Sequence, residues 1–199
     1  MSWKRLVLLP LMIVLPSCSM DGGSSGTGIT SAAGDVIGMT HPEGIQVVVE
    51  GTDLMGETDT DGRFVVRGRF EGRVTLDFRR AGDALMAQFP ITVPLGGSLT
   101  LHGVQIDPSE PHATVASEDI VCDALVEETA CETQAVMLVS LGNPDGGYTY
   151  TLHLDGSSLH DRHGAVVACE DLQAGDRLSL QGSAAYDGSF SDADVEVSR

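Results

Sequence analysis

The stretch "GIQVVVEGTDLMGETDTDGRFVVRG", residues 44–68, decides the fold class. Its first run places Ile45, Val47 and Val49 at alternate positions, and its last run does the same with Phe64 and Val66. Alternate residues of a β-strand point to one face, so each run offers an apolar face to a core. The polar segment between the runs is rich in Gly, Asp and Thr, which is typical of turns. The stretch therefore predicts two short strands separated by a turn.

The same alternation extends over residues 34–107, with turn residues every 8 to 12 positions. The other positions that share a face within their runs are Val74, Leu76 and Phe78, then Phe89, Ile91 and Val93, then Leu99 and Leu101. Regularly spaced short strands of this kind are typical of a sandwich. We expect an antiparallel β-sandwich of about seven strands.

This segment also resembles the carboxypeptidase regulatory-like, transthyretin-like domain. The resemblance rests on a V-x-V strand, a Gly-Thr turn and a Thr-Asp-x-x-Gly-x-Phe motif, matched by Gly51, Thr52, Thr58, Asp59, Gly62 and Phe64. It implies a structural, adhesive or spacer module that has no catalytic residues. "DTDGR" at 59–63 also offers oxygen ligands for calcium, but the acidic residue that ends a calcium loop is missing. A hairpin turn in which Gly62 takes a positive φ is the favoured interpretation.

The segment "DPSEP", residues 107–111, interrupts the alternation and predicts a domain boundary within 107–112. Beyond it, residues 113–199 again alternate, as in "YTYTLHL", and predict a small barrel or a second sandwich. "SEDIVCDALVEETACET" differs, because its acidic residues are compatible with a helix. The C-terminal part resembles small bacterial OB-like barrel domains, through Asp171, Leu172, Gly175, Asp176, Leu178, Leu180 and Gly182. The chain is therefore predicted to be all-β, with a sandwich at 34–107 and an OB-like barrel at 113–199.

The N-terminus predicts export and anchoring. Lys4 and Arg5 precede the apolar run 6–15, which is too short to span a bilayer and is typical of a signal peptide. "LPSC", residues 15–18, resembles a bacterial lipobox, which implies cleavage after residue 17 and acylation of Cys18. Residues 18–33 are rich in Gly, Ser and Thr, which is typical of a flexible tether. Ser19, by resemblance to proteobacterial lipoproteins, favours the outer membrane.

Charge limits the partners. After residue 17 the chain carries nine basic and 29 acidic side chains, a formal charge of −20. A basic surface for nucleic acid or for anionic lipid is therefore not expected. We expect the attachment to the membrane to be covalent.

Three cysteines remain after Cys18, an odd number for an oxidising compartment. We expect one disulfide among Cys122, Cys131 and Cys169, with Cys122–Cys131 as the local choice and the connectivity open. Their separations of nine and 38 residues do not suit zinc, whose ligands commonly include close Cys pairs.

"HLDGSSLHDRH", residues 153–163, gathers three of the six histidines beside two aspartates. A solvated loop between strands is the favoured interpretation, while His153, His160 and His163 remain the candidate ligands for zinc or copper. No nucleophile elbow, HExxH motif, phosphate loop or dinucleotide fingerprint is present. We therefore expect a non-enzymatic envelope lipoprotein without a cofactor, which binds a protein or an envelope polymer. The alternatives are a ligand- or metal-binding lipoprotein that uses the 153–163 loop or the barrel groove, and a hydrolase with an unrecognised site.

Overall fold

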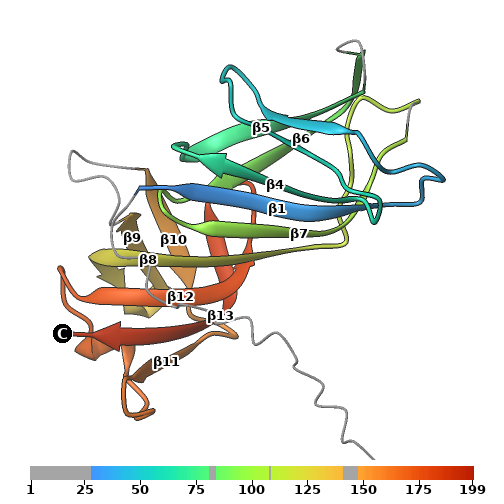
Figure 1. The fold of residues 1–199 in the computed structure, drawn as a ribbon. Coiled ribbons are helices and arrows are strands. Elements are labelled where there is room, and N and C mark those ends of the chain that lie inside the picture. Colours follow the sequence, from blue (N-terminus) through green and yellow to red (C-terminus); the bar gives the residue numbers. More distant parts are fainter. Residues whose placement is uncertain (1–27, 81–83, 108, 141–147) are drawn as a thin grey trace, which may run out of the picture.

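The computed structural model describes residues 28–80, 84–107, 109–140 and 148–199, and this part of the chain is all-β (Figure 1). The elements, in chain order, are β1 (Thr30–Ile37), β2 (Gln46–Val49), β3 (Met55–Glu57), β4 (Arg63–Gly68), β5 (Gly72–Arg80), β6 (Ala84–Val93), β7 (Ser98–Gln105), β8 (Ser117–Ala130), η1 (Cys131–Thr133), β9 (Ala135–Ser140), β10 (Thr149–His153), β11 (Ser158–Asp161), η2 (Cys169–Asp171), β12 (Arg177–Ala184) and β13 (Ser189–Ser198). The two η elements are single turns of 3₁₀ helix.

Strands β1 to β7, together with the first part of β8, form a sandwich of two layers. One layer is the antiparallel sheet β3-β2-β5-β6. The other layer is the part of the larger sheet that has the order β4-β1-β7-β8 (Figure 1). Most side chains of the faces predicted from alternation are buried between the layers, and Ile45, Val47 and Val49 have no exposed surface. Val74 and Phe89 of these faces are only half-buried. Phe64 of β4 meets Phe78 of β5 edge to face, with ring centroids 5.7 Å apart. Burial of such side chains contributes about 1.5–3 kcal/mol each, which holds the two layers together.

Strand β1 departs from the sequence prediction in two ways. It runs parallel to β7, so the larger sheet is mixed, and it begins at Thr30, inside the predicted tether 18–33. Its small residues allow close packing, because a Cβ atom at Gly34 would lie 2.9 Å from Cζ of Phe64. The Thr30 hydroxyl donates a hydrogen bond to the carbonyl of Phe70 at 2.6 Å. Pairing with β4 and β7 therefore overrides a composition that in isolation favours a flexible chain.

Residues 117–199 form a closed barrel. The pairings run β8-β9-β10-β13-β12 and return to β8, so five strands complete a ring. Strands β10 and β13 pair in parallel over only two residue pairs, and β11 continues along the same edge of β13. The predicted small barrel is therefore confirmed, while its OB-like character stays a prediction. The helical interpretation of 117–133 is wrong, because residues 117–130 form the long strand β8.

Strand β8 belongs to both parts. Its residues 117–121 pair with β7 of the sandwich, and its residues 124–130 pair with β9 of the barrel, while β12 lies along the opposite edge. The segment 107–112 also contacts the smaller sheet, because the backbone N–H of Gln88 in β6 donates a hydrogen bond to the Pro111 carbonyl at 2.9 Å. The sheet thus crosses the predicted boundary, and the division into 34–107 and 113–199 stays a prediction.

An aromatic contact joins the sandwich to the barrel away from β8. The Tyr150 hydroxyl of β10 donates to the carbonyl of Val93 in β6 at 2.9 Å, and the Tyr150 ring stacks on Phe190 of β13. The Arg73 guanidinium of β5 lies over the Tyr186 ring, 5.5 Å from its centroid. One continuous cluster of buried apolar side chains runs through both parts.

Candidate functional site

The stretch 153–163 is not a single loop. Residues 158–161 form β11, which returns as a hairpin: the Val167 amide donates to the Leu159 carbonyl at 3.0 Å, and the Asp161 amide donates to the Ala165 carbonyl at 2.8 Å. The carboxylate of Asp161 accepts the backbone amides of Ala165 and His163, and these bonds lower its pKa. The turn is therefore held by its own aspartate, and Arg162 and His163 stand at its tip.

The three candidate histidines have separate environments. His160 bonds through Nδ1 to the Asp161 carbonyl and through Nε2 to the Asp194 carboxylate at 2.9 Å, and these contacts, the first above all, raise its pKa. His163 accepts a hydrogen bond from Arg162, and His153 lies at the end of β10. Within the described ranges, no three His, Cys, Asp or Glu side chains are placed to hold a metal ion. The geometry thus does not bring the three candidate ligands together.

A polar pocket of about 380 Å³ lies beside this hairpin tip. Its lining residues are Asp161, Arg162, His163, Val167, Val197, Ser198 and Arg199. Parallel pairing of β11 with β13 sets Asp161 opposite Val197, so the two strands end at the same edge. Arg162 and Arg199 follow these ends directly and meet at the pocket, although they are 37 positions apart in the sequence.

The two arginines of the pocket are held differently. The Nε of Arg199 lies 3.4 Å from the Asp176 carboxylate, and its guanidinium also donates to the Asp171 carbonyl. The Nε of Arg162 donates to Nε2 of His163 at 3.2 Å. The sequence pattern points to His163 and its neighbouring Asp161 but not to either arginine, because only the register of β11 and β13 brings the arginines together.

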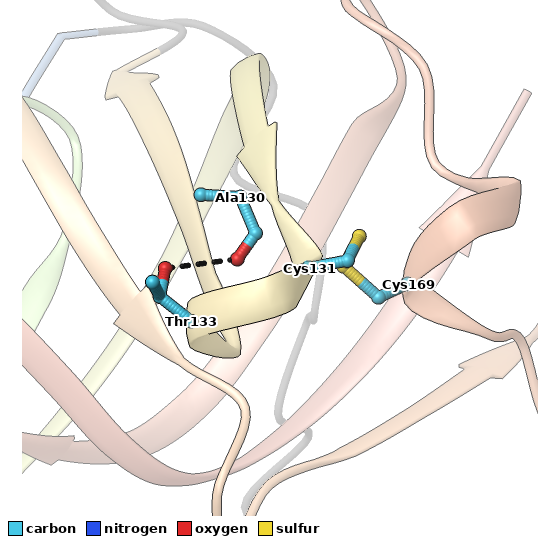
Figure 2. The surroundings of a disulfide bond; sticks show 4 residues. All are labelled: Ala130, Cys131, Thr133 and Cys169. Atoms are coloured by element: carbon cyan, nitrogen blue, oxygen red, sulfur yellow. Dashed lines mark hydrogen bonds between the residues drawn. A yellow bond between two sulfur atoms is a disulfide. The ribbon is translucent and has the colours of Figure 1, made fainter.

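The disulfide joins Cys131 to Cys169, whose Cα atoms are 5.7 Å apart (Figure 2). The two cysteines open the 3₁₀ turns η1 and η2, and Figure 2 shows the sulfur atoms meeting between these turns. The local pair Cys122–Cys131 is not the bonded one. An extended strand rises about 3.3 Å per residue, so eight residues of β8 between them hold these cysteines roughly 30 Å apart. Cys122 is a buried free thiol on the core face of β8.

The predicted positive φ of Gly62 is confirmed, but the turn at 59–63 is not a hairpin turn, because β3 and β4 do not pair with each other. Gly62 has φ +79°, and the Asp59 carboxylate accepts the amides of Asp61 and Arg63, both at 2.9 Å. The strands it connects, β3 and β4, lie in different layers, so the turn forms a corner of the sandwich. An Asp59 oxygen that calcium would need is thus already bonded to the backbone.

A second pocket, of about 350 Å³, lies beside the edge strand β6. It is lined by Leu85, Met86, Gln88, Ser109, Glu110 and Pro111. It carries one ionisable side chain, Glu110, so its chemistry is poorer than that of the pocket at the hairpin tip.

No protein-family model matches the chain, and no curated protein matches it. Cys18, the predicted signal at 1–17 and most of the tether lie outside the described residues. Among the residues that are described, no helix is long and apolar enough to cross a membrane.

Proposed function

We propose that this chain is a non-enzymatic bacterial envelope lipoprotein whose all-β body is held at a membrane, as an interaction module, by an acylated Cys18. The support for the anchor is the order of basic, apolar and small residues before Cys18. The observation that carries the proposal is the start of the fold: Thr30 and Ala32 are already buried in the sandwich, twelve and fourteen residues after Cys18.

The short connection sets the distance between body and bilayer. A chain of twelve residues spans at most about 40 Å when fully extended, and its root-mean-square length as a coil is about 20 Å. The acidic body would therefore remain within a few nanometres of the membrane surface. Two or three acyl chains provide a stable anchor where one does not. A partner in this proposal is a protein or a polymer of the envelope, and the favoured location is the outer membrane.

The anchor is tested by mass spectrometry of the N-terminal peptide and by fractionation of the Cys18→Ser variant. We expect a mature peptide that begins with an acylated Cys18, and a variant that leaves the membrane fraction. Density-gradient separation of the membranes then tests the outer-membrane assignment. A Cys18→Ser protein that is still processed and still firmly membrane-bound would contradict the proposal.

A second candidate function, ligand binding, is favoured by the pocket at the β11–β13 edge. The metal-binding form of this candidate gains no support from the geometry, because His153, His160 and His163 do not converge. A small-molecule ligand agrees better with a pocket of about 380 Å³.

A further inference from the structure

The pocket at the β11–β13 edge brings two arginines together, beside one aspartate, in an acidic protein. All nine basic residues after Cys18 are arginines, and two of them, Arg162 and Arg199, line this one pocket together with His163. They come from two strands that run in parallel and end at the same edge. The hydroxyl-bearing Ser198 and the apolar side chains of Val167 and Val197 complete the lining.

The acidic groups nearby are already committed to bonds within the protein. Asp161 accepts two backbone amides of its own turn, and Asp176 accepts the Gln173 amide and pairs with Arg199. Arg162 makes one hydrogen bond, to the imidazole of His163, and its charge helps to lower the pKa of Asp161. No carboxylate of the described residues lies within 4 Å of its guanidinium. A guanidinium has five N–H donors in a planar fork that matches carboxylate and phosphate. The Arg162 side chain therefore has donors available for an anion.

We propose that this pocket binds a small anionic group, a carboxylate or a phosphate, with Arg162 as the main contact and with Ser198 as a further donor. The charge of −20 does not forbid this, because at physiological salt charges more than about 8 Å away are largely screened. The same charge disfavours a long polyanion, whose other groups would meet the acidic surface. The inference rests on the interaction-module part of the proposed function and is independent of the anchor.

The test uses the full chain in a nonionic detergent, titrated with sodium phosphate and, separately, with sodium acetate. Sodium chloride at matched ionic strength is the reference, and backbone amide chemical shifts are the readout. We expect saturable shifts at residues 161–167 and 197–199 with at least one of the two anions. Saturation by phosphate alone, by acetate alone or by both supports the site and identifies its chemistry.

Variants separate this site from a general effect of charge. Arg162→Gln should weaken binding about tenfold to a hundredfold, because it removes a charge-assisted hydrogen bond. Arg162→Lys should give an intermediate loss, since it keeps the charge but not the fork. Arg67→Gln is the matched control: Arg67 is exposed on β4 in the sandwich, and the same loss of charge there should leave binding unchanged.

Three results would overturn the inference: shifts that do not saturate, shifts that chloride reproduces, or equal losses in Arg162→Gln and Arg67→Gln. Arg162→Gln should still fold, because the turn is held by backbone bonds and by Asp161 rather than by Arg162. A circular dichroism melt of each variant verifies this. A failed anchor assignment would leave these titrations unchanged, so the two proposals fail separately.

Discussion

Loss of the Cys131–Cys169 disulfide should destabilise the protein strongly, because the bond closes a long loop. The cysteines are 38 residues apart in sequence. In the chain-entropy model, closing a loop of this length constrains the unfolded chain by about 4 kcal/mol at 25 °C, against about 2.7 kcal/mol for a ten-residue loop. For a body of this size each kcal/mol shifts the melting temperature by about 2–4 °C, so we expect a decrease of about 8–16 °C.

The assay is a thermal melt of the full chain, followed by circular dichroism, in four conditions. The unchanged chain is melted without additive, with a reductant and with a chelator. The double variant Cys131→Ser/Cys169→Ser is melted without additive. Reductant and double variant should lower the midpoint by similar amounts, and the chelator should leave it unchanged. Mass spectrometry of unreduced peptides should show the 131–169 link directly.

Cys122→Ala is the matched control, because it removes a cysteine but keeps the bond. Burial, with a smaller contribution from Asp123, raises the pKa of the Cys122 thiol to about 12, so this thiol should not exchange with the disulfide. The reasoning is refuted if reductant and double variant leave the midpoint where it was. A midpoint lowered by chelator but not by reductant would instead support a metal clamp.

Two further predictions concern the shared strand β8 and its neighbours. Burial raises the pKa of Glu118 to about 7 from an ordinary 4.5, so its ionisation opposes folding and stability should fall as pH rises from about 4.5 to 7. Because this side chain is only half-buried, we expect Glu118→Gln to raise the free energy of unfolding by only about 1 kcal/mol at pH 8. Urea unfolding over a range of pH should also show a flatter pH dependence in this variant, and an unchanged pH profile would contradict the prediction. Limited proteolysis within 107–112 should give fragments near 34–107 and 113–199. These fragments should co-elute in size-exclusion chromatography until denaturant is added, because β7 stays paired with β8. Native fragments that elute apart would show that this pairing does not hold them together.

Local patterns in the sequence predict the strands well because alternation is a local property. The buried faces of β2 and β4, the positive φ of Gly62 and the barrel-forming run at 148–154 all follow from neighbouring residues. Strand β1 does not follow from its neighbouring residues in the sequence, since its small and polar residues acquire a strand conformation only between β4 and β7. The acidic residues of β8 are likewise compatible with a helix when the segment is considered alone. Pairing along both edges of β8 fixes the strand conformation.

The candidate site and the disulfide depend on contacts that no local pattern contains. Cys131 meets Cys169, and Arg162 meets Arg199, only after the barrel has closed. Proximity in sequence favours the Cys122–Cys131 pair, but the extended strand between these cysteines keeps them apart. It reached the 153–163 stretch through its histidines, while the parallel register that places the arginines together is a tertiary property.

Strand β8 has a consequence for binding as well as for stability. Its core face passes from the sandwich, where Ile120 pairs with Leu99, to the barrel, where Ala124 pairs with Leu178. The barrel therefore cannot reorient against the sandwich without breaking ladder hydrogen bonds of β8, and Tyr150 secures a second contact with Val93. Because the barrel is fixed to the sandwich, binding at the β11–β13 edge need not first order the two parts of the chain, and this entropy is not lost on association. An interaction module held a short distance from a membrane would thus present its pocket in one orientation relative to the start of β1.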